Sequence, residues 1–148
     1  MKVNGSPSGL LVHRKSFIVK SSTRRQAVEV RDEVEGAVRD AGVQNGMVLV
    51  NCLHTTCSVV VTEAGIEDFV ALMARLIQDG GAYLHNDVRW SDCERGNAAA
   101  HLRASLLGHG VAIGITEGAL ALDELHSILL AEWDGPRSRT VNIHILGA

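Results

Sequence analysis

The stretch VAIGITEGALALDELHSILLAEWDGPRSRTVNIHIL, residues 111–146, decides the fold class. Apolar runs recur in it with only turn-forming residues or short polar segments between them. They predict strands at residues 111–115, 119–122, 127–133 and 140–146. Glu117 and Gly118 predict a hairpin turn between the first two strands. Strands that follow one another without intervening helices are typical of antiparallel sheets, so we expect an α+β fold, mainly an antiparallel β-sandwich with a few flanking helices.

The earlier part of the chain adds further strands and the helices that flank them. Apolar, β-branched runs predict strands at residues 10–20, 47–53 and 57–62. Apolar residues at helical spacing predict helices at residues 27–41, 66–78 and 98–107. Gly42 is expected to close the first helix, and Asn45 with Gly46 predicts a turn after it. The third helix is expected to have Asn97 as its N-cap and Gly108 at its end.

Length and composition indicate one folded domain. The chain has 148 residues, of which 46% are hydrophobic and 21% are charged, as in soluble globular proteins. Residues 1–9, with Gly, Pro and Ser, are expected to form a flexible leader, and residues 10–148 a single domain. The net charge of −3 argues against nucleic acid as a partner, because such binding needs a basic surface. No apolar run reaches the roughly 20 residues of a membrane span, so we expect a cytoplasmic protein without a membrane partner.

Acid–base and ligand-type side chains are dense in YLHNDVRWSDCERGNAAAHLRASLLG, residues 83–108. In the expected helix, Asn97, His101 and Ser105 recur every four residues and therefore line one side. The alanine and the two leucines that follow these residues in sequence predict a buried apolar stripe beside them. His85 adds a second imidazole before the helix. This pattern indicates a site, with Asn97 and Ser105 as candidate catalytic groups.

Three histidines are candidate ligands of a divalent metal ion: His54, His85 and His101. Each lies at the end of an expected segment or on the expected helix, with Asn, Ser, Thr or Asp close by in sequence. Three imidazoles that leave one position open to water are typical of a catalytic zinc ion, our first candidate, with magnesium as the second. Two simpler interpretations stay open. His54 caps the turn between two strands, and His101 is a half-exposed helical histidine.

Arg95 and Arg137 are candidate ligands of a phosphate group. Arg95 precedes the expected N-terminus of the third helix, where backbone N–H groups favour anions, and Arg137 lies in the last turn. Solvated arginines and an ordinary helix cap explain the same residues equally well. Glu63 and Glu132 each close an expected strand, and the end of a strand often opens onto a cleft. Glu63 therefore joins the candidate catalytic groups.

The cysteines of the chain show no metal or redox spacing. Cys52, Cys57 and Cys93 contain no C-x-x-C pair, which argues against a zinc ribbon or a thioredoxin-like site. We expect them to be small buried residues. Cys57 is of most interest, because it lies close to His54 in sequence.

Short motifs run through nearly the whole chain in a characteristic order. They are His54-Thr55-Thr56, Thr62-Glu63, Tyr83, His85-Asn86, GNAAAHL at 96–102, SLLG at 105–108, Gly118, Leu120, Leu122, Glu132 and Asp134-Gly135-Pro136-Arg137. Together they resemble the YjbQ-like family of small uncharacterised proteins, also called secondary thiamine-phosphate synthases. The resemblance implies an α+β sandwich that assembles as a homotrimer, with a histidine-lined pocket for a metal ion or an anion. It also implies a weak ability to join the pyrimidine and thiazole halves of thiamine phosphate.

The chain departs from the family pattern at positions that the resemblance places close to the pocket. Thr62-Glu63-Ala64 stands where the family has Asn-Glu-Asn, Asp123-Glu124 where it has Gly-Thr, and Leu125-His126 where it has Trp-Gln. His126 adds a potential ligand or base, and the loss of Trp removes a wall of the pocket. The resemblance therefore leaves the choice of substrate open.

The leading hypothesis is a cytoplasmic homotrimeric enzyme with a histidine-lined metal pocket. In this hypothesis the divalent ion is held by His54, His85 and His101, the ligand or water is oriented by Glu63, Asn97 and Ser105, and a phosphate of a small substrate is bound by Arg95 or Arg137. Two alternatives stay open. One is a non-catalytic trimeric protein that binds a metabolite or a metal, and the other is a trimer whose histidines serve packing between subunits.

Overall fold

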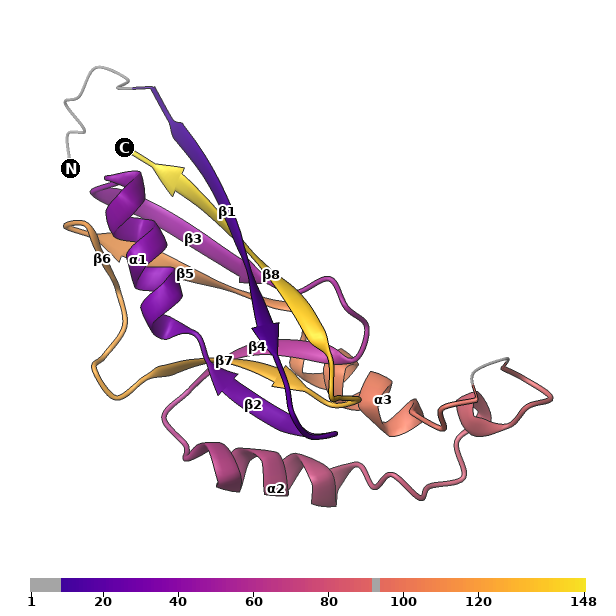
Figure 1. The fold of residues 1–148 in the computed structure, drawn as a ribbon. Coiled ribbons are helices and arrows are strands. Elements are labelled where there is room, and N and C mark those ends of the chain that lie inside the picture. Colours follow the sequence, from indigo (N-terminus) through magenta and orange to yellow (C-terminus); the bar gives the residue numbers. More distant parts are fainter. Residues whose placement is uncertain (1–8, 92–93) are drawn as a thin grey trace, which may run out of the picture.

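The structure of the protein is a computed structural model that describes residues 9–91 and 94–148. Its strands form two sheets in which the strand pairings are antiparallel. The larger sheet has, in spatial order, β1 (Leu11–Lys20), β8 (Ser138–Gly147), β3 (Asn45–Asn51), β5 (Gly110–Thr116) and β6 (Ala119–Leu120). The smaller sheet has β2 (Gln26–Glu29), β7 (Ser127–Glu132) and β4 (Cys57–Thr62). The expected antiparallel α+β fold is confirmed (Figure 1).

The helices flank the sheets toward opposite ends of the molecule. α1 (Arg31–Ala41) lies beside the end of the larger sheet that carries β6, whereas α2 (Ile66–Leu76) and α3 (Ala98–Leu107) lie with the smaller sheet (Figure 1). A short 3-10 turn, η1 (Leu84–Asn86), precedes α3. Within residues 9–91 and 94–148, no helix is long and apolar enough to cross a membrane.

Residues 26–29 form β2 and not the start of the first helix, so that part of the helix prediction is wrong. Ala27 of β2 lies opposite Ala131 of β7, and both side chains are buried. Backbone pairing with β7 outweighs the helical spacing of the apolar residues in this segment. α1 therefore begins only at Arg31, and it ends as expected at Gly42, whose φ is 69°.

Asn45 and Gly46 begin β3, so the turn predicted there is also wrong. A Cβ atom on Gly46 would lie 2.1 Å from the carbonyl oxygen of Leu146 in β8. Glycine is required at this position because two strands approach closely, not because the backbone turns. The hairpin expected at Glu117 and Gly118 is confirmed, with φ angles of 52° and 77°.

The last two strands, β7 and β8, follow each other in sequence but belong to different sheets. The link between them passes close to the segment after β1, since a Cβ atom on Gly135 would lie 2.3 Å from the Thr23 carbonyl oxygen. The crossing brings Asp134 beside Arg95, which precedes α3. It also places Arg139, at the start of β8, in contact with Glu132 at the end of β7. It therefore positions the polar side chains of the candidate site.

Two apolar clusters fill the interior. The larger cluster joins α1 to both sheets and includes Val34, Val48 and Ile143. The smaller cluster joins α2 and α3 to β7 and includes Met73 and Trp133. α3, which carries His101, packs against the smaller sheet through this cluster.

α3 buries its small residues, so the predicted leucine stripe is wrong. Leu102 and Leu106 are 44% and 65% exposed, whereas Ala100 and Ala104 are buried in the smaller cluster. Alanine side chains let the helix backbone lie close to its neighbours, and leucines on that side would not fit. Arg103 is buried with the alanines, and its guanidinium carbon lies 5.8 Å from the centre of the Trp133 ring.

Candidate active site

The first turn of α3 is capped from η1 and not by its own N-cap residue. Asn97 occupies the N-cap position as expected, but its side chain makes no capping hydrogen bond. Asn86 Oδ1 instead accepts from the backbone N–H of Ala98 over 2.9 Å. The Asn97 side chain turns toward Asp134 and His85, and this is the start of the site.

Asp134, Asn97 and His85 form a hydrogen-bonded chain. Asn97 Nδ2 donates to Asp134 Oδ2 over 3.0 Å, and Asn97 Oδ1 lies 3.2 Å from His85 Nε2. An ionised carboxylate only accepts, so the amide nitrogen faces Asp134 and the amide oxygen faces His85. His85 Nε2 must therefore carry the proton, and Nδ1 carries the lone pair of the neutral ring.

His101 is held in the opposite tautomer. Its Nδ1 lies 3.2 Å from the carbonyl oxygen of Thr55, which only accepts, so Nδ1 carries the proton and Nε2 the lone pair. The rings of His85 and His101 meet edge to face, with centroids 4.8 Å apart and planes at 74°. Each imidazole is thus oriented through one nitrogen, while the other nitrogen is basic and suited to proton transfer or metal binding.

Asp134 is also the point at which arginines meet. Arg95 Nε donates to Asp134 Oδ2 over 2.8 Å, and Arg137 Nη2 lies 3.8 Å from the same oxygen. Burial of Asp134 by itself would raise the pKa of its carboxyl, but hydrogen bonds from Arg95 and Asn97 outweigh burial and leave that pKa below its ordinary value. Asp134 therefore stays ionised, which is the state that orients the Asn97 amide.

A second buried carboxylate, Glu132, connects the site to Thr56, in the turn before β4. Arg139 Nε donates to Glu132 Oε2, and Arg139 Nη2 donates to Thr56 Oγ1 over 2.7 Å. The backbone N–H of Asp134 donates to Glu132 Oε1 over 2.7 Å. Burial by itself would raise the pKa of Glu132, but the bonds from Arg139 and from the Asp134 backbone leave it below its ordinary value. The network fixes the backbone on both sides of the histidine pair.

The cysteines of the described chain belong to this support. Cys52 and Cys57 are both buried, as expected. Cys57 Sγ donates to Glu132 Oε2 over 3.3 Å, so the thiol helps to satisfy the buried carboxylate. Cys93 lies outside the described residues.

The structure brings most of the predicted site residues to one corner. His85, His101, Asn97, Arg95 and Arg137 meet there through the contacts described above. His54 is half-buried in the turn that includes Thr55, the residue that holds His101. Among the described residues, no group of three or more His, Cys, Asp or Glu side chains is placed to hold a metal ion.

Glu63 lies apart from this corner. β4 and β7 are paired so that Cys57 lies opposite Glu132, whereas Glu63 follows the other end of β4. Six strand residues span about 20 Å, which is the separation between Glu63 and the Glu132 end of the sheet. Ser105 is exposed on α3, one turn beyond His101.

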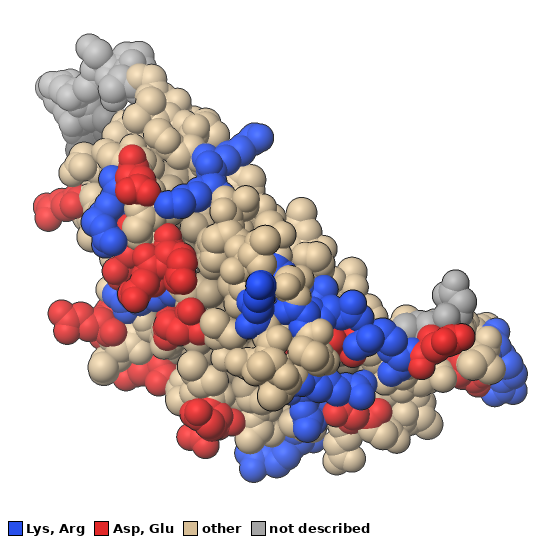
Figure 2. All heavy atoms as spheres, viewed as in Figure 1, with Lys and Arg blue, Asp and Glu red and all other residues tan. Residues whose placement is uncertain are grey.

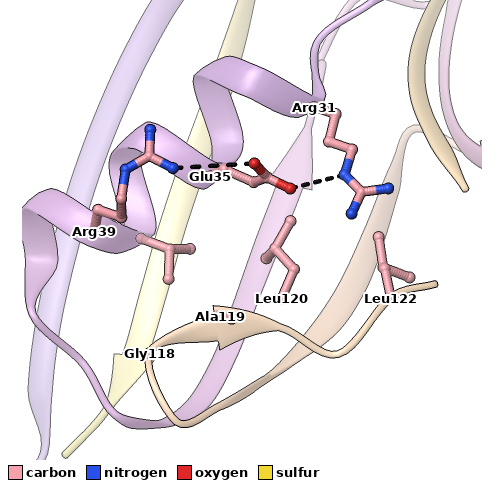
Figure 3. A pocket seen from close by; sticks show the side chains of 8 residues that line it. Arg31, Glu35, Arg39, Gly118, Ala119, Leu120 and Leu122 are labelled. Carbon is pink, nitrogen blue, oxygen red and sulfur yellow. Dashed lines mark hydrogen bonds and ion pairs between the residues drawn. The ribbon is translucent and has the colours of Figure 1, made fainter. Parts of the chain in front are cut away.

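Leu125 and His126, where the chain departs from the family pattern, precede β7 at the end opposite Glu132. A pocket of about 340 Å³ lies near this end, between α1 and the β5–β6 hairpin (Figure 3). On the α1 side of the pocket, Arg31 Nε and Arg39 Nη1 lie 2.8 and 4.0 Å from the carboxylate of Glu35, one helical turn away on either side. Arg31 Nη1 also donates to the backbone carbonyl oxygens of Asp123, Glu124 and His126, at 2.9, 3.2 and 2.6 Å.

Sequence reasoning missed the role of Asp134, which organises the site. Charged residues on both sides of a Gly-Pro pair, directly after a buried strand, were the available signal. The pairing of Arg139 with Glu132 was missed as well, because it joins the start of β8 to the end of β7. Arg24 carried no signal at all, because its contact to the carbonyl oxygen of Gly96 joins segments that are distant in sequence.

Fold and site together define a small antiparallel α+β protein with a histidine pair oriented by an amide and a buried carboxylate, beside a cluster of arginines. Residues 15–148 match the family described as "UPF0047 protein YjbQ-like", and the chain belongs to this family. A UPF0047 protein of Archaeoglobus fulgidus is 35% identical over 131 residues, which cover 86% of this chain and 97% of that protein. The UPF0047 protein YugU of Bacillus subtilis is 29% identical, over 90% of this chain and 98% of its own length.

Solved structures of relatives agree with the fold. A YbjQ-like protein of unknown function from Sulfolobus solfataricus superposes with a TM-score of 0.87 at 29% identity, covering 95% of this chain and 100% of that one. A hypothetical protein from Aeropyrum pernix superposes with a TM-score of 0.83 at 37% identity, covering 92% of this chain and 99% of that one. The resemblance found in the sequence is confirmed.

Proposed function

We propose that the protein is an enzyme that applies acid–base chemistry to a small phosphorylated molecule. The observation that best supports this is the edge-to-face contact of His85 with His101, whose ring centroids lie 4.8 Å apart and whose hydrogen-bond partners favour a different protonated nitrogen in each ring. When one imidazole of such a pair is protonated, it can donate a proton while the other accepts one. Two histidines that served packing alone would not each need a hydrogen-bond partner that fixes the tautomer, Asn97 for His85 and the Thr55 carbonyl oxygen for His101.

The neighbouring side chains take complementary roles in this proposal. Asn97 and Asp134 orient His85, and they do so without touching the substrate. Arg95 and Arg137 bind the phosphate, since both guanidinium groups are partly exposed. Ser105, exposed one turn beyond His101, orients substrate or water.

A divalent metal ion, zinc before magnesium, is the cofactor that we propose for the histidines. His85 Nδ1 and His101 Nε2 carry lone pairs in the tautomers described above, which is what a metal ligand requires, and His54 is the third candidate. When bound, such an ion supplies Lewis acidity and lowers the pKa of its bound water.

Elemental analysis of the untagged protein tests the metal proposal. We expect near-stoichiometric zinc or another divalent metal in the wild type, and its loss in His54→Ala, His85→Ala and His101→Ala. Circular dichroism controls for folding. A metal content that is unchanged in His101→Ala refutes the assignment.

A turnover assay tests the enzyme proposal. The weak synthesis of thiamine phosphate from its pyrimidine and thiazole halves, which the family resemblance implies, is the first reaction to assay, followed by a panel of phosphorylated metabolites. We expect about a 100-fold loss of rate in His85→Ala and His101→Ala, typical of a lost acid–base group. Arg75→Gln, an exposed charge on α2, is the control.

A non-catalytic metabolite- or metal-binding protein is the second candidate, and the cluster of arginines around Asp134 favours it equally. It predicts that ligands bind without any turnover in the same panel. Binding and turnover measured on one preparation separate the two functions.

We further propose that the chain forms a homotrimer, as the family resemblance implies. Because Glu63 lies at the far end of β4, a catalytic role for it requires that a second subunit bring it to the histidine pair. Light scattering is expected to give three times the chain mass of 15.8 kDa. A monomeric mass at micromolar concentration contradicts both the trimer and the role of Glu63.

A further inference from the structure

Arg24, in the link between β1 and β2, lies beside the arginines of the candidate active site. Its Nη2 donates to the carbonyl oxygen of Gly96 over 3.5 Å, and its own carbonyl oxygen accepts from the N–H of Gly135 over 2.8 Å. Gly96 is the neighbour of Arg95 in sequence, and Gly135 is the neighbour of Asp134. The two bonds therefore hold Arg24 next to the pair formed by Arg95 and Asp134.

Three arginines from three separate segments gather here: Arg95 and Arg137 at the Asp134 carboxylate, and Arg24 at the neighbouring Gly96 carbonyl oxygen. The side chains of Arg95 and Arg137 are 49% and 38% exposed, Arg24 is exposed, and Asp134 is buried. Lysine and arginine side chains crowd the surface around the start of β8 and the approach to α3, whereas acidic side chains gather over α1 (Figure 2). The accessible charge at the site is therefore positive, which favours an anionic ligand.

Arg24 is the arginine best placed to change its partner. Its bond to Gly96 is 3.5 Å long and ends on an uncharged carbonyl oxygen, whereas Arg95 donates to the Asp134 carboxylate over 2.8 Å. A guanidinium that binds phosphate gains the attraction of opposite charges and can form two parallel hydrogen bonds, which a single carbonyl oxygen does not offer. Exchange of the Gly96 contact for an anion is therefore favourable, while Arg95 keeps its bond to Asp134.

We propose that Arg24 completes, with Arg95 and Arg137, a phosphate cradle that binds the head group of a phosphate monoester. The inference rests on the proposed function, because it names the substrate class of the same site. A phosphate monoester carries a charge of about −1.5 to −2 near neutral pH and three strong acceptor oxygens, one for each guanidinium. A carboxylate has one charge and two oxygens, so the phosphate cradle selects phosphate over carboxylate.

An NMR titration of the full chain with inorganic phosphate tests the phosphate cradle without turnover. The Gly96 amide and the Nε–H groups of Arg95 and Arg137 report binding. We expect Arg24→Gln to raise the phosphate dissociation constant about fivefold or more, and acetate to bind about tenfold more weakly than phosphate. Arg25→Gln removes the same charge one residue away, but Arg25 pairs with Asp79 at 2.9 Å, so it is the matched control.

The possible outcomes separate the phosphate cradle from the proposed enzyme. Equal phosphate affinity in Arg24→Gln and Arg25→Gln, a Gly96 signal that phosphate does not move, or acetate that binds as tightly as phosphate overturns the inference. Phosphate binding that depends on Arg24, in a protein that turns over nothing in the substrate panel, supports the phosphate cradle and removes the enzymatic function. Loss of turnover in His101→Ala with unchanged phosphate binding supports both.

Discussion

Asn97 donates from Nδ2 to Asp134 Oδ2 over 3.0 Å, and this bond decides which nitrogen of His85 carries the proton. The carboxylate acts on the imidazole through an amide, not through a direct bond. It therefore fixes the orientation and the tautomer of His85 without taking part in proton transfer on the ring.

The first prediction concerns the two tautomers. Proton–nitrogen correlation NMR in mildly alkaline buffer is expected to show His85 protonated at Nε2 and His101 at Nδ1. In Asp134→Asn the new amide presents either a donor or an acceptor to Asn97, so His85 should become a mixture of tautomers. His101, held by the Thr55 carbonyl oxygen, should not change and is the internal control. A wild-type His85 protonated at Nδ1 contradicts the hydrogen-bonded chain.

The second prediction concerns the buried ion pair of Glu132 with Arg139. Glu132→Gln keeps the shape of the side chain but leaves the buried guanidinium without its full counter-charge. We expect a loss of about 3 kcal/mol in the free energy of unfolding, measured by urea denaturation. Glu124→Gln, on the exposed loop before β7, should change it by less than about 0.5 kcal/mol. Similar losses in both variants would show that the buried ion pair contributes no more to the free energy of unfolding than an exposed carboxylate does.

The third prediction is the loss of stability in acid. The pKa values of Glu132 and Asp134 are below their ordinary values in the folded protein, so the unfolded chain takes up protons at a higher pH than the folded chain does. The stability that these carboxylates contribute is therefore complete above the ordinary pKa of about 4 and is lost as the pH falls through the lower folded values. Urea midpoints between pH 7 and pH 3, as about the range in which carboxylates titrate, measure this. In Asp134→Asn the urea midpoint should fall less steeply as the pH decreases. An unchanged dependence of the midpoint on pH contradicts the prediction.

The fourth prediction compares two arginines that share one carboxylate. Arg103 and Arg25 both pair with Asp79 at 2.9 Å, but their side chains are 0% and 39% exposed. Arg103→Met removes a buried charge that also lies over the Trp133 ring, and we expect a loss of about 2–4 kcal/mol in the free energy of unfolding. Arg25→Gln should cost less than about 1 kcal/mol. Equal losses in thermal unfolding of the two variants would rule out burial as the cause of the difference.

Patterns of neighbouring residues predicted the strands well and the contacts between helices less well. The runs that become β5 and β7 are mostly apolar, and β8 alternates polar with apolar residues, so local sequence was enough to predict all three as strands. The face that α3 buries was predicted wrongly because spacing alone does not tell an alanine stripe from a leucine stripe. Only the closeness of the neighbouring elements, which the sequence does not show, favours the small residues.

In the candidate site, too, short-range spacing was predicted correctly, whereas contacts between distant segments were not. The i, i+4 spacing of Asn97 and His101 correctly placed both at one end of the site, because both lie on or beside one helix. Asp134 could not be placed from the sequence, since its position follows from a chain crossing between two sheets. Glu63 directly follows a strand as expected, but the antiparallel pairing places it at the end of the smaller sheet opposite Glu132.

Arg31 holds the segment before β7 through backbone oxygens alone. Every amino acid offers the same carbonyl oxygen, so the bonds from Arg31 do not depend on which side chains residues 123–126 carry. These are the positions at which the chain departs from the family pattern in Asp123-Glu124 and Leu125-His126. Asp123 also holds the segment with its carboxylate, which accepts from the Leu125 N–H over 3.0 Å. At Glu124, Leu125 and His126 the side chain can therefore be replaced without loss of the bonds to Arg31, so the segment can acquire new surface chemistry without a new shape.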